Sequence, residues 1–240
     1  MLIVGHRGAR HEAPENTLNS FVHAYDHGCR RFELDIQLSS DQHLMVFHDT
    51  SLKRTTGKRG RLVDFDSDYL KQLDARNNTP GWGSVCPIPS LNEILDALPQ
   101  VDHWQFEVKP DSRYRLGVIT RELSRLIDLY GLHQRATITS SSTWILRTLQ
   151  SLHPSISTGL VYESRLGNPV KRALALDCDY LCLDKKLVTK KRITNAQNLG
   201  MHVSVWTVND LEEMEKLKAL GVDSIITDHP SMAIRRFEAR

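Results

Sequence analysis

The fold is decided by residues 1–49, which read MLIVGHRGARHEAPENTLNSFVHAYDHGCRRFELDIQLSSDQHLMVFHD. The apolar runs in this stretch predict a first strand at Leu2–Gly5 and a second at Phe32–Leu38, with a helix near Glu15–Gly28 between them. A short polar turn then predicts that Leu44–Phe47 returns antiparallel to the second strand as a hairpin. The stretch therefore begins a strand–helix–strand pattern, and its polar motifs fall at the ends of the strands.

The same alternation continues along the chain. Further strands are expected at Trp104–Val108, Ala136–Thr139, Ser157–Val161, Tyr180–Leu183, His202–Trp206 and Val222–Ile226. Ser90 is expected to cap a helix, with Glu93 at the reciprocal position of a capping box. Further helices are expected from Asp111 or Ser112 to Gly131, at Trp144–Leu152, Pro169–Leu176 and Thr189–Leu199, from Asp210 to Gly221, and at Pro230–Phe237. Apart from the hairpin return this gives eight strands, and 240 residues suffice for one barrel. With no GxGxxG or Walker loop to favour an open sheet, the sequence predicts an α/β fold, a closed TIM (β/α)8 barrel.

Residues 50–87 differ from the rest of the chain. They follow the hairpin, are rich in charged residues, Asn, Pro and Gly, and contain too few apolar residues for a core of their own. We therefore predict a single domain over residues 1–240, in which residues 50–87 form an inserted cap region over the site.

The composition limits the possible partners and the compartment. A net charge of +2 and a pI near 8.3, with no basic block interleaved with aromatics, argue against a nucleic-acid partner. The sequence shows no signal peptide and no apolar run near the roughly 18 residues of a membrane span, so no stable membrane association is expected. The cysteines Cys29, Cys86, Cys178 and Cys182 have no zinc or CxxC spacing, and we expect buried thiols in a reducing cytoplasm.

In a parallel barrel, chemistry lies at the C-terminal ends of the strands. The polar residues that the sequence places at those ends, or on the hairpin beside them, include His6, Arg7, Glu33, Asp35, His48, Glu107, Lys109 and Trp206. Side chains two apart on a strand share a face, so Glu33 points with Asp35. By the same rule Glu107 points with Lys109, and the hairpin returns His48 towards the level of these groups.

Three carboxylates that converge in a barrel mouth repel one another unless a cation lies between them. A divalent cation that prefers oxygen ligands, Mg²⁺ or Ca²⁺, between Glu33, Asp35 and Glu107 is the simplest solution. Arg7 and Lys109 beside such a cation form an electropositive pocket suited to a phosphate group.

Two histidines, His6 and His48, flank this pocket, and the pKa of histidine suits a general acid–base pair. A metal ion, phosphate-binding cations and two histidines together indicate phosphodiester cleavage. Each motif alone has a simpler interpretation: Glu33 with Asp35 as an exposed strand edge or as salt-bridge partners, a lone histidine as a hydrogen-bonded structural residue, and Trp206 as part of the core. Their joint occurrence at successive strand ends favours the catalytic interpretation.

The motifs resemble those of the glycerophosphodiester phosphodiesterase family over essentially the whole chain. They are His6-Arg7-Gly8, Pro14-Glu15-Asn16-Thr17, Glu33-Leu34-Asp35, His48-Asp49 with Leu52 and Arg54-Thr55-Thr56-Gly57, Pro89-Ser90-Leu91, Glu107-x-Lys109, Val205-Trp206-Thr207-Val208-Asn209 and Ile226-Thr227-Asp228. The resemblance implies a TIM barrel with residues 50–87 as the inserted region, and metal-assisted hydrolysis of a small-molecule glycerophosphodiester to sn-glycerol 3-phosphate and an alcohol. The roles it implies are metal ligation by Glu33, Asp35 and Glu107, acid–base catalysis by His6 and His48, phosphate contact from Arg7 and Lys109, and a pocket wall at Trp206.

One stretch departs from the family pattern. A Ser-Phe pair is expected after the fourth strand, whereas this chain reads Thr139-Ser140-Ser141-Ser142, which leaves the preference for the alcohol open. Two alternatives keep the site and change the function: a lysophospholipase D acting on lysolipids, for which the sequence offers no clear apolar slot, and a barrel that binds phosphate esters without turnover. The sequence does not decide between Mg²⁺ and Ca²⁺, between the two histidines as acid and base, between water and the substrate's own hydroxyl as nucleophile, or among oligomeric states.

Overall fold

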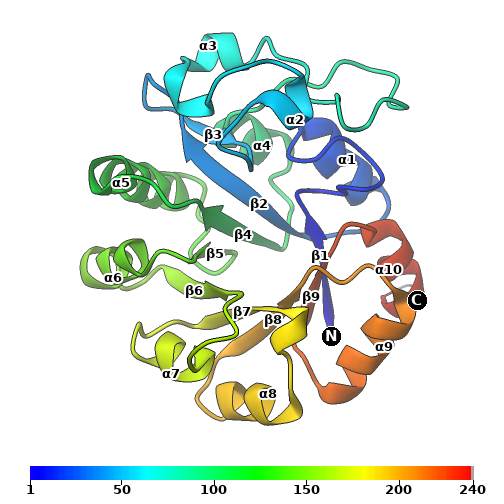
Figure 1. The fold of residues 1–240 in the computed structure, drawn as a ribbon, viewed down its shortest axis with the longest axis vertical. Coiled ribbons are helices and arrows are strands. Elements are labelled where there is room, and N and C mark those ends of the chain that lie inside the picture. Colours follow the sequence, from blue (N-terminus) through cyan, green and yellow to red (C-terminus); the bar gives the residue numbers. More distant parts are fainter. Residues whose placement is uncertain (239–240) are drawn as a thin grey trace.

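Eight parallel strands close into a ring in the computed structural model of the chain, which describes residues 1–238 (Figure 1). The strands of the sheet are β1 (Leu2–His6), β2 (Arg31–Leu38), β3 (Leu44–Val46), β4 (His103–Val108), β5 (Ala136–Ser140), β6 (Ser157–Tyr162), β7 (Tyr180–Asp184), β8 (His202–Trp206) and β9 (Ser224–Thr227). Their order is β1-β9-β8-β7-β6-β5-β4-β2, and the ring closes because β1 also pairs with β2, where His6 lies beside Glu33. The strand β3 pairs antiparallel with β2 as the predicted hairpin. The TIM-barrel prediction is confirmed.

The helices lie outside the ring of strands (Figure 1). They are α1 (Leu18–Asp26), α2 (Lys53–Thr56), η1 (Leu62–Asp64), α3 (Ser67–Leu70), α4 (Leu91–Ala97), α5 (Arg113–Leu129), α6 (Thr143–Leu152), α7 (Pro169–Leu174), η2 (Lys185–Leu187), α8 (Lys190–Gln197), α9 (Leu211–Leu220) and α10 (Pro230–Phe237). Ser90 and Glu93 form the predicted capping box at α4, and Ser112 rather than Asp111 caps α5. Over residues 1–238, no helix has the length and apolar character needed to cross a membrane.

The first helix begins later than the sequence predicts. It starts at Leu18 instead of near Glu15, because Thr17 is its N-cap and accepts a hydrogen bond from the first turn. Asn16 has a φ of +55°, a left-handed conformation that a right-handed helix excludes. A turn, rather than a helix, therefore places Glu15 and Asn16 beside the strand ends.

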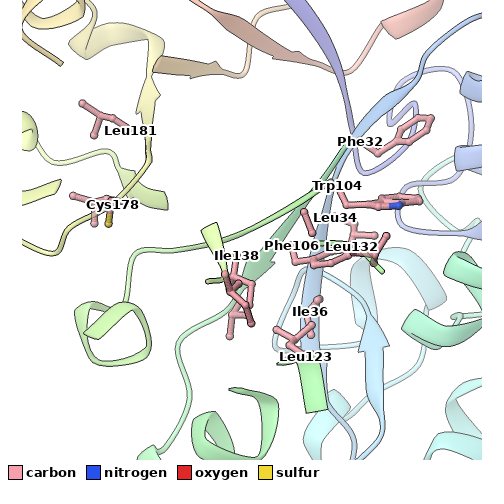
Figure 2. Close-up of a cluster of buried hydrophobic side chains, with 14 of the residues drawn as sticks. Phe32, Leu34, Ile36, Trp104, Phe106, Leu123, Leu132, Ile138, Cys178 and Leu181 are labelled. Carbon is pink, nitrogen blue, oxygen red and sulfur yellow. The ribbon is translucent and has the colours of Figure 1, made fainter. Parts of the chain in front are cut away.

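The larger core lies between the ring of strands and the helices. Phe32, Leu34 and Ile36 of β2 are fully buried there, and Figure 2 shows them beside the aromatic side chains of β4. Because side chains alternate along a strand, the intervening Glu33 and Asp35 face the inside of the ring. Burying one large apolar side chain contributes roughly 1.5–3 kcal/mol, so the outward face of β2 fixes the direction of its two carboxylates.

Residues 50–87 share a small second core with the hairpin that precedes them. Its buried side chains are Met45, Phe47, Leu52, Leu62, Leu70, Leu73, Ala75 and Ile88. The hairpin supplies Met45 and Phe47 to this cluster, so the apolar residues of the segment do not form a core by themselves. The segment also contains α2, η1 and α3. Its role as a cap stays a prediction.

A stack of three rings lies inside the N-terminal end of the barrel. The ring centroids of His103 and Tyr180 are 5.7 Å apart, and those of Tyr180 and His202 are 4.4 Å apart. The Nε2 atom of His202 also lies 2.8 Å from Oγ of Ser224. Burial, together with the charges of His202 and Arg31, lowers the pKa of His103 to about 4.

Acid is expected to destabilise the fold through this stack. A histidine in the unfolded chain takes up a proton near pH 6.5, whereas His103 in the folded protein does so near pH 4. Stability should therefore fall as the pH drops across that interval and level off below it, by about 3 kcal/mol in total. Urea denaturation at several pH values should show a smaller fall in His103→Gln and the wild-type fall in a control, His27→Gln, whose ring is exposed. Equal falls in wild type and His103→Gln would contradict the prediction.

Candidate active site

A cavity of about 490 Å³ opens at the C-terminal ends of the barrel strands. Seven of the residues predicted from the sequence line it: His6, Arg7, Glu33, His48, Glu107, Lys109 and Trp206. The eighth, Asp35, lies beside them with a fully buried side chain. Trp206 is half-buried at the cavity wall, not within the core, and its indole Nε1 donates to the backbone oxygen of Cys182 at 3.4 Å. Residues 50–87, all of which the structure describes, contribute no lining residue.

The carboxylates of Glu33, Asp35 and Glu107 converge at one side of the cavity. Their nearest oxygen atoms lie within 4.8 Å of one another, because Glu33 and Asp35 share a face of β2 and Asp35 pairs in register with Glu107 on β4. The Oε1 atom of Glu33 is buried and has no hydrogen-bond partner in the described part of the chain. Burial and the negative charges of Asp35 and Glu107 raise the pKa of Glu33 well above its usual value. An all-oxygen set with mutual repulsion and an unpaired buried oxygen fits a hard divalent cation.

Two cations flank the carboxylates. The Nε atom of Arg7 lies 3.0 Å from Oδ2 of Asp35. The ammonium of Lys109 lies 2.7 Å from Oδ1 of Asp35 and 2.6 Å from Oε1 of Glu107. Burial acts to raise the pKa of Asp35, but Lys109 and Arg7 hold it far below its usual range. The ionised Asp35 therefore keeps both cations at the cavity.

The backbone turn after β1 directs Arg7 towards the cavity. Arg7 and Gly8 both have positive φ, +51° and +84°. A Cβ atom at Gly8 would lie only 2.5 Å from Oγ of Ser20 on α1, so glycine is required for the turn to pack against that helix.

His6 is oriented by a carboxylate from the other end of the chain. Its Nδ1 atom lies 2.5 Å from Oδ1 of Asp228, and the other oxygen of that carboxylate, Oδ2, accepts a hydrogen bond from Asn209 at 2.7 Å. Burial acts to raise the pKa of Asp228, but the hydrogen bond with His6 holds it below its usual range. An ionised Asp228 accepts the hydrogen on Nδ1, which leaves Nε2 of His6, 3.8 Å from Glu33, as the ring nitrogen without a hydrogen.

His48 is oriented by a chain of ion pairs that reaches Arg7. Its Nδ1 atom lies 2.7 Å from Oδ1 of Asp49, and Arg54 donates to both oxygens of Asp49, at 2.7 and 2.9 Å. Arg54 also donates to both oxygens of Glu15, at 2.6 and 2.8 Å. Glu15 in turn accepts from Arg7 at 2.7 Å. Burial acts to raise the pKa of Glu15, but Arg54 and Arg7 lower it to about 2, so the chain stays charged.

The residues that orient the two histidines and the Asp35 carboxylate have no role predicted from the sequence. The residues concerned are Glu15, Asn16, Asp49, Arg54, Asn209 and Asp228, and all of them stand in the motifs quoted for the family resemblance. Asn16, for example, donates to Oδ2 of Asp35 at 2.7 Å. Their membership of a motif was the available signal, but spacing along the chain did not indicate which side chain each one contacts.

Arg54→Ala is expected to lower turnover about tenfold to a hundredfold. Loss of the guanidinium frees Asp49 and Glu15, so the ring of His48 is less well positioned. Steady-state kinetics should show the fall mainly in kcat, with a shifted pH profile, and Arg54→Lys should not restore it because one ammonium cannot fork onto two carboxylates. Arg61→Ala, an exposed arginine of the same segment paired with Asp64, is the control. Wild-type turnover in Arg54→Ala would contradict the assignment.

Comparison with known proteins identifies the class of this barrel as phosphoric diester hydrolase. Residues 6–232 match the profile of the glycerophosphoryl diester phosphodiesterase family. The chain is 32% identical over 234 residues to the glycerophosphodiester phosphodiesterase of Caldanaerobacter subterraneus subsp. tengcongensis, which covers 97% of this chain and 96% of that protein. The chain therefore belongs to the glycerophosphoryl diester phosphodiesterase family and is an enzyme.

Two further similarities span nearly all of the chain. The structure of an Oleispira antarctica phosphodiesterase in complex with the product sn-glycerol-3-phosphate has a TM-score of 0.89 at 25% identity, over 100% of this chain and 97% of that chain. Lysophospholipase D GDPD1 of Homo sapiens is 23% identical over 273 residues, which cover 95% of this chain and 83% of that protein.

Proposed function

We propose that this enzyme hydrolyses a small-molecule glycerophosphodiester to sn-glycerol 3-phosphate and an alcohol, in a reaction that depends on a divalent cation. The observation that carries the proposal is the meeting of three carboxylates, two cations and two carboxylate-anchored histidines around one cavity. The relative that is 32% identical and the structural neighbour bound to sn-glycerol-3-phosphate support it.

The carboxylates of Glu33, Asp35 and Glu107 would hold the cation, Mg²⁺ or Ca²⁺. Bound there, it would polarise a phosphoryl oxygen of the substrate. Arg7 and Lys109 bind the other non-bridging oxygen of the phosphodiester, with charge-assisted hydrogen bonds from the guanidinium and the ammonium. Because both cations are already held in place by Asp35, they stabilise the charge that builds up in the transition state without moving.

His6 and His48 form the acid–base pair. Asp228 and Asp49 each engage the Nδ1 atom of one histidine, so both rings have Nε2 available for proton exchange. One Nε2 takes the proton from the attacking hydroxyl group, and the other donates a proton to the alkoxide that leaves. Trp206 lines the wall of the cavity against which the alcohol packs.

Metal replacement tests the proposal. Chelator-treated protein is incubated with glycerophosphocholine or glycerophosphoethanolamine, Mg²⁺ or Ca²⁺ is added back separately, and glycerol 3-phosphate is measured. Product that appears only with metal supports the reaction and names the ion. Turnover that persists in chelator overturns the metal dependence.

A lysophospholipase D activity is the second candidate, favoured by the similarity to the human enzyme of that name. Lysophosphatidylcholine in the same assay distinguishes it, because cleavage of the lysolipid alone would replace the glycerophosphodiester as substrate. Absence of product from every ester would leave a barrel that binds phosphate esters without turnover.

We further propose that the enzyme acts in a reducing compartment, the cytoplasm. All four cysteines are buried free thiols. Burial raises the pKa of Cys29 to about 12, which keeps that thiol protonated and unreactive.

A further inference from the structure

The lining of the active-site cavity is electrostatically asymmetric. Its cations and its convergent carboxylates come from the part of the chain that ends with the β4–α5 loop. From β5 to β9 the lining residues are Thr139, Ser141, Val161, Glu163, Cys182, Trp206, Thr207 and Ile226. Glu163 is the single charged group among them.

The wall formed by β6, β7 and β8 faces the proposed metal site. In the strand order β7 lies opposite β2, which carries Glu33 and Asp35 (Figure 1). Val161 and Glu163, two residues apart at the end of β6, point to the same side of the strand. Trp206 comes from β8, two strands further round the ring. When the phosphate of a bound ester lies at the cations, the rest of the ester therefore faces the opposite half of the cavity. That half is lined by apolar and aromatic side chains and one carboxylate.

The carboxylate of Glu163 has no ion-pair partner within 4.0 Å in the described part of the chain, although Arg165 stands two residues away. Its side chain is exposed, at the point where β6 has just ended. Each of the other three carboxylates at the cavity instead lies in the Glu33, Asp35 and Glu107 cluster. Among the carboxylates at the cavity, Glu163 is therefore the one that can pair with a positive charge on a ligand.

We propose that Glu163 and Trp206 form a subsite for an alcohol that carries an ammonium group, such as ethanolamine or choline. This inference rests on the proposed function. The face of an indole ring attracts an ammonium ion, and the Glu163 carboxylate, which lines the same cavity, supplies the opposite charge. The same carboxylate repels an alcohol with net negative charge, so the subsite selects for cationic over neutral and anionic head groups.

The expected size of this selection is modest because Glu163 is exposed. An ion pair at such a site changes affinity by a factor of about three to five. Wild type should therefore prefer glycerophosphoethanolamine to glycerophosphoglycerol by about that factor in kcat/KM. Glu163→Gln should bring the ratio close to one, and Glu163→Lys should invert it.

The experiment measures kcat/KM for glycerophosphoethanolamine, glycerophosphoglycerol and glycerophosphoserine with the metal-loaded enzyme. Calorimetry measures Kd for the same esters with the metal-loaded His48→Ala protein, in which hydrolysis during the titration is slow. Glu212→Gln, the same substitution at a highly exposed glutamate of α9, is the matched control and should keep the wild-type ratios. Ratios that follow the charge at position 163 in the order Glu, Gln, Lys support the subsite. Ratios that are the same in wild type, Glu163→Gln and Glu163→Lys overturn it.

The two proposals fail differently in this experiment. If no ester is hydrolysed, the proposed function fails, and the Kd ratios still decide whether Glu163 selects the head group. If all three esters are hydrolysed with ratios independent of residue 163, the function stands and the ammonium subsite is rejected.

Discussion

His48→Ala is expected to lower kcat by about 10²–10⁴, the usual effect of losing a general acid or base. His48 faces the cavity, and its Nδ1 atom is bonded to Asp49, so its removal takes away a proton carrier and little else. The free energy of unfolding should change little because a third of the His48 side chain is exposed. Release of glycerol 3-phosphate and a thermal melt of the same sample measure the two quantities.

The control for this substitution lies in the same hairpin. His43 is largely exposed and contacts Asp41 rather than the cavity, so His43→Ala should retain wild-type turnover. His6→Ala is a less clean test, because His6 is buried against Asp228 and its loss leaves that carboxylate without a partner. Turnover of His48→Ala within threefold of wild type would refute its catalytic role.

The fold could be predicted because the strands follow a simple alternation of apolar and polar residues. The strand expected at Phe32–Leu38 is found at Arg31–Leu38, and the other barrel strands agree to within one or two residues. The last strand shows why boundaries slip. It was expected from Val222 but begins at Ser224, because the amide of Val222 bonds back to Leu217 and so belongs to the end of α9.

The site could be predicted as far as its reactive groups, but not the contacts that orient them. Glu33 and Asp35 follow from strand alternation alone. The bond between His6 and Asp228 joins residues 222 positions apart and exists only because the first and last strands of the barrel, β1 and β9, lie side by side. Arg54 lies in a segment without clear periodicity, where no sequence pattern indicates that one guanidinium bridges two carboxylates.

The ion pairs of Arg54 with Glu15 and Asp49 connect residues 50–87 to the active site. Arg54 belongs to α2, whose neighbour Leu52 is anchored in the small second core. Packing in that core therefore fixes where Arg54 meets Glu15 and Asp49. The segment acts on His48 and Arg7 through this arginine, even though it contributes no lining residue to the cavity.

Glu33→Gln is expected to lower metal-dependent turnover by about 10³-fold. The same substitution is expected to stabilise the metal-free protein. The substitution removes one of three carboxylates whose oxygens lie within 4.8 Å, and with it a ligand charge worth several kcal/mol in catalysis. The same change relieves repulsion with Asp35 and Glu107. A gain of about 1 kcal/mol would raise Tm in chelator by about 2–4 °C.

A thermal melt with and without metal separates these effects. Added Mg²⁺ or Ca²⁺ should raise the Tm of wild type, because an ion that binds only the folded state stabilises it. The rise should be lost in Glu33→Gln and kept in Glu163→Gln, the same substitution at the opposite wall of the cavity. An equal metal-induced rise in wild type and Glu33→Gln would mean that Glu33 is not a ligand. A lower Tm of Glu33→Gln in chelator would mean that the Glu33 charge stabilises the metal-free fold through Arg7 more than it repels its neighbours.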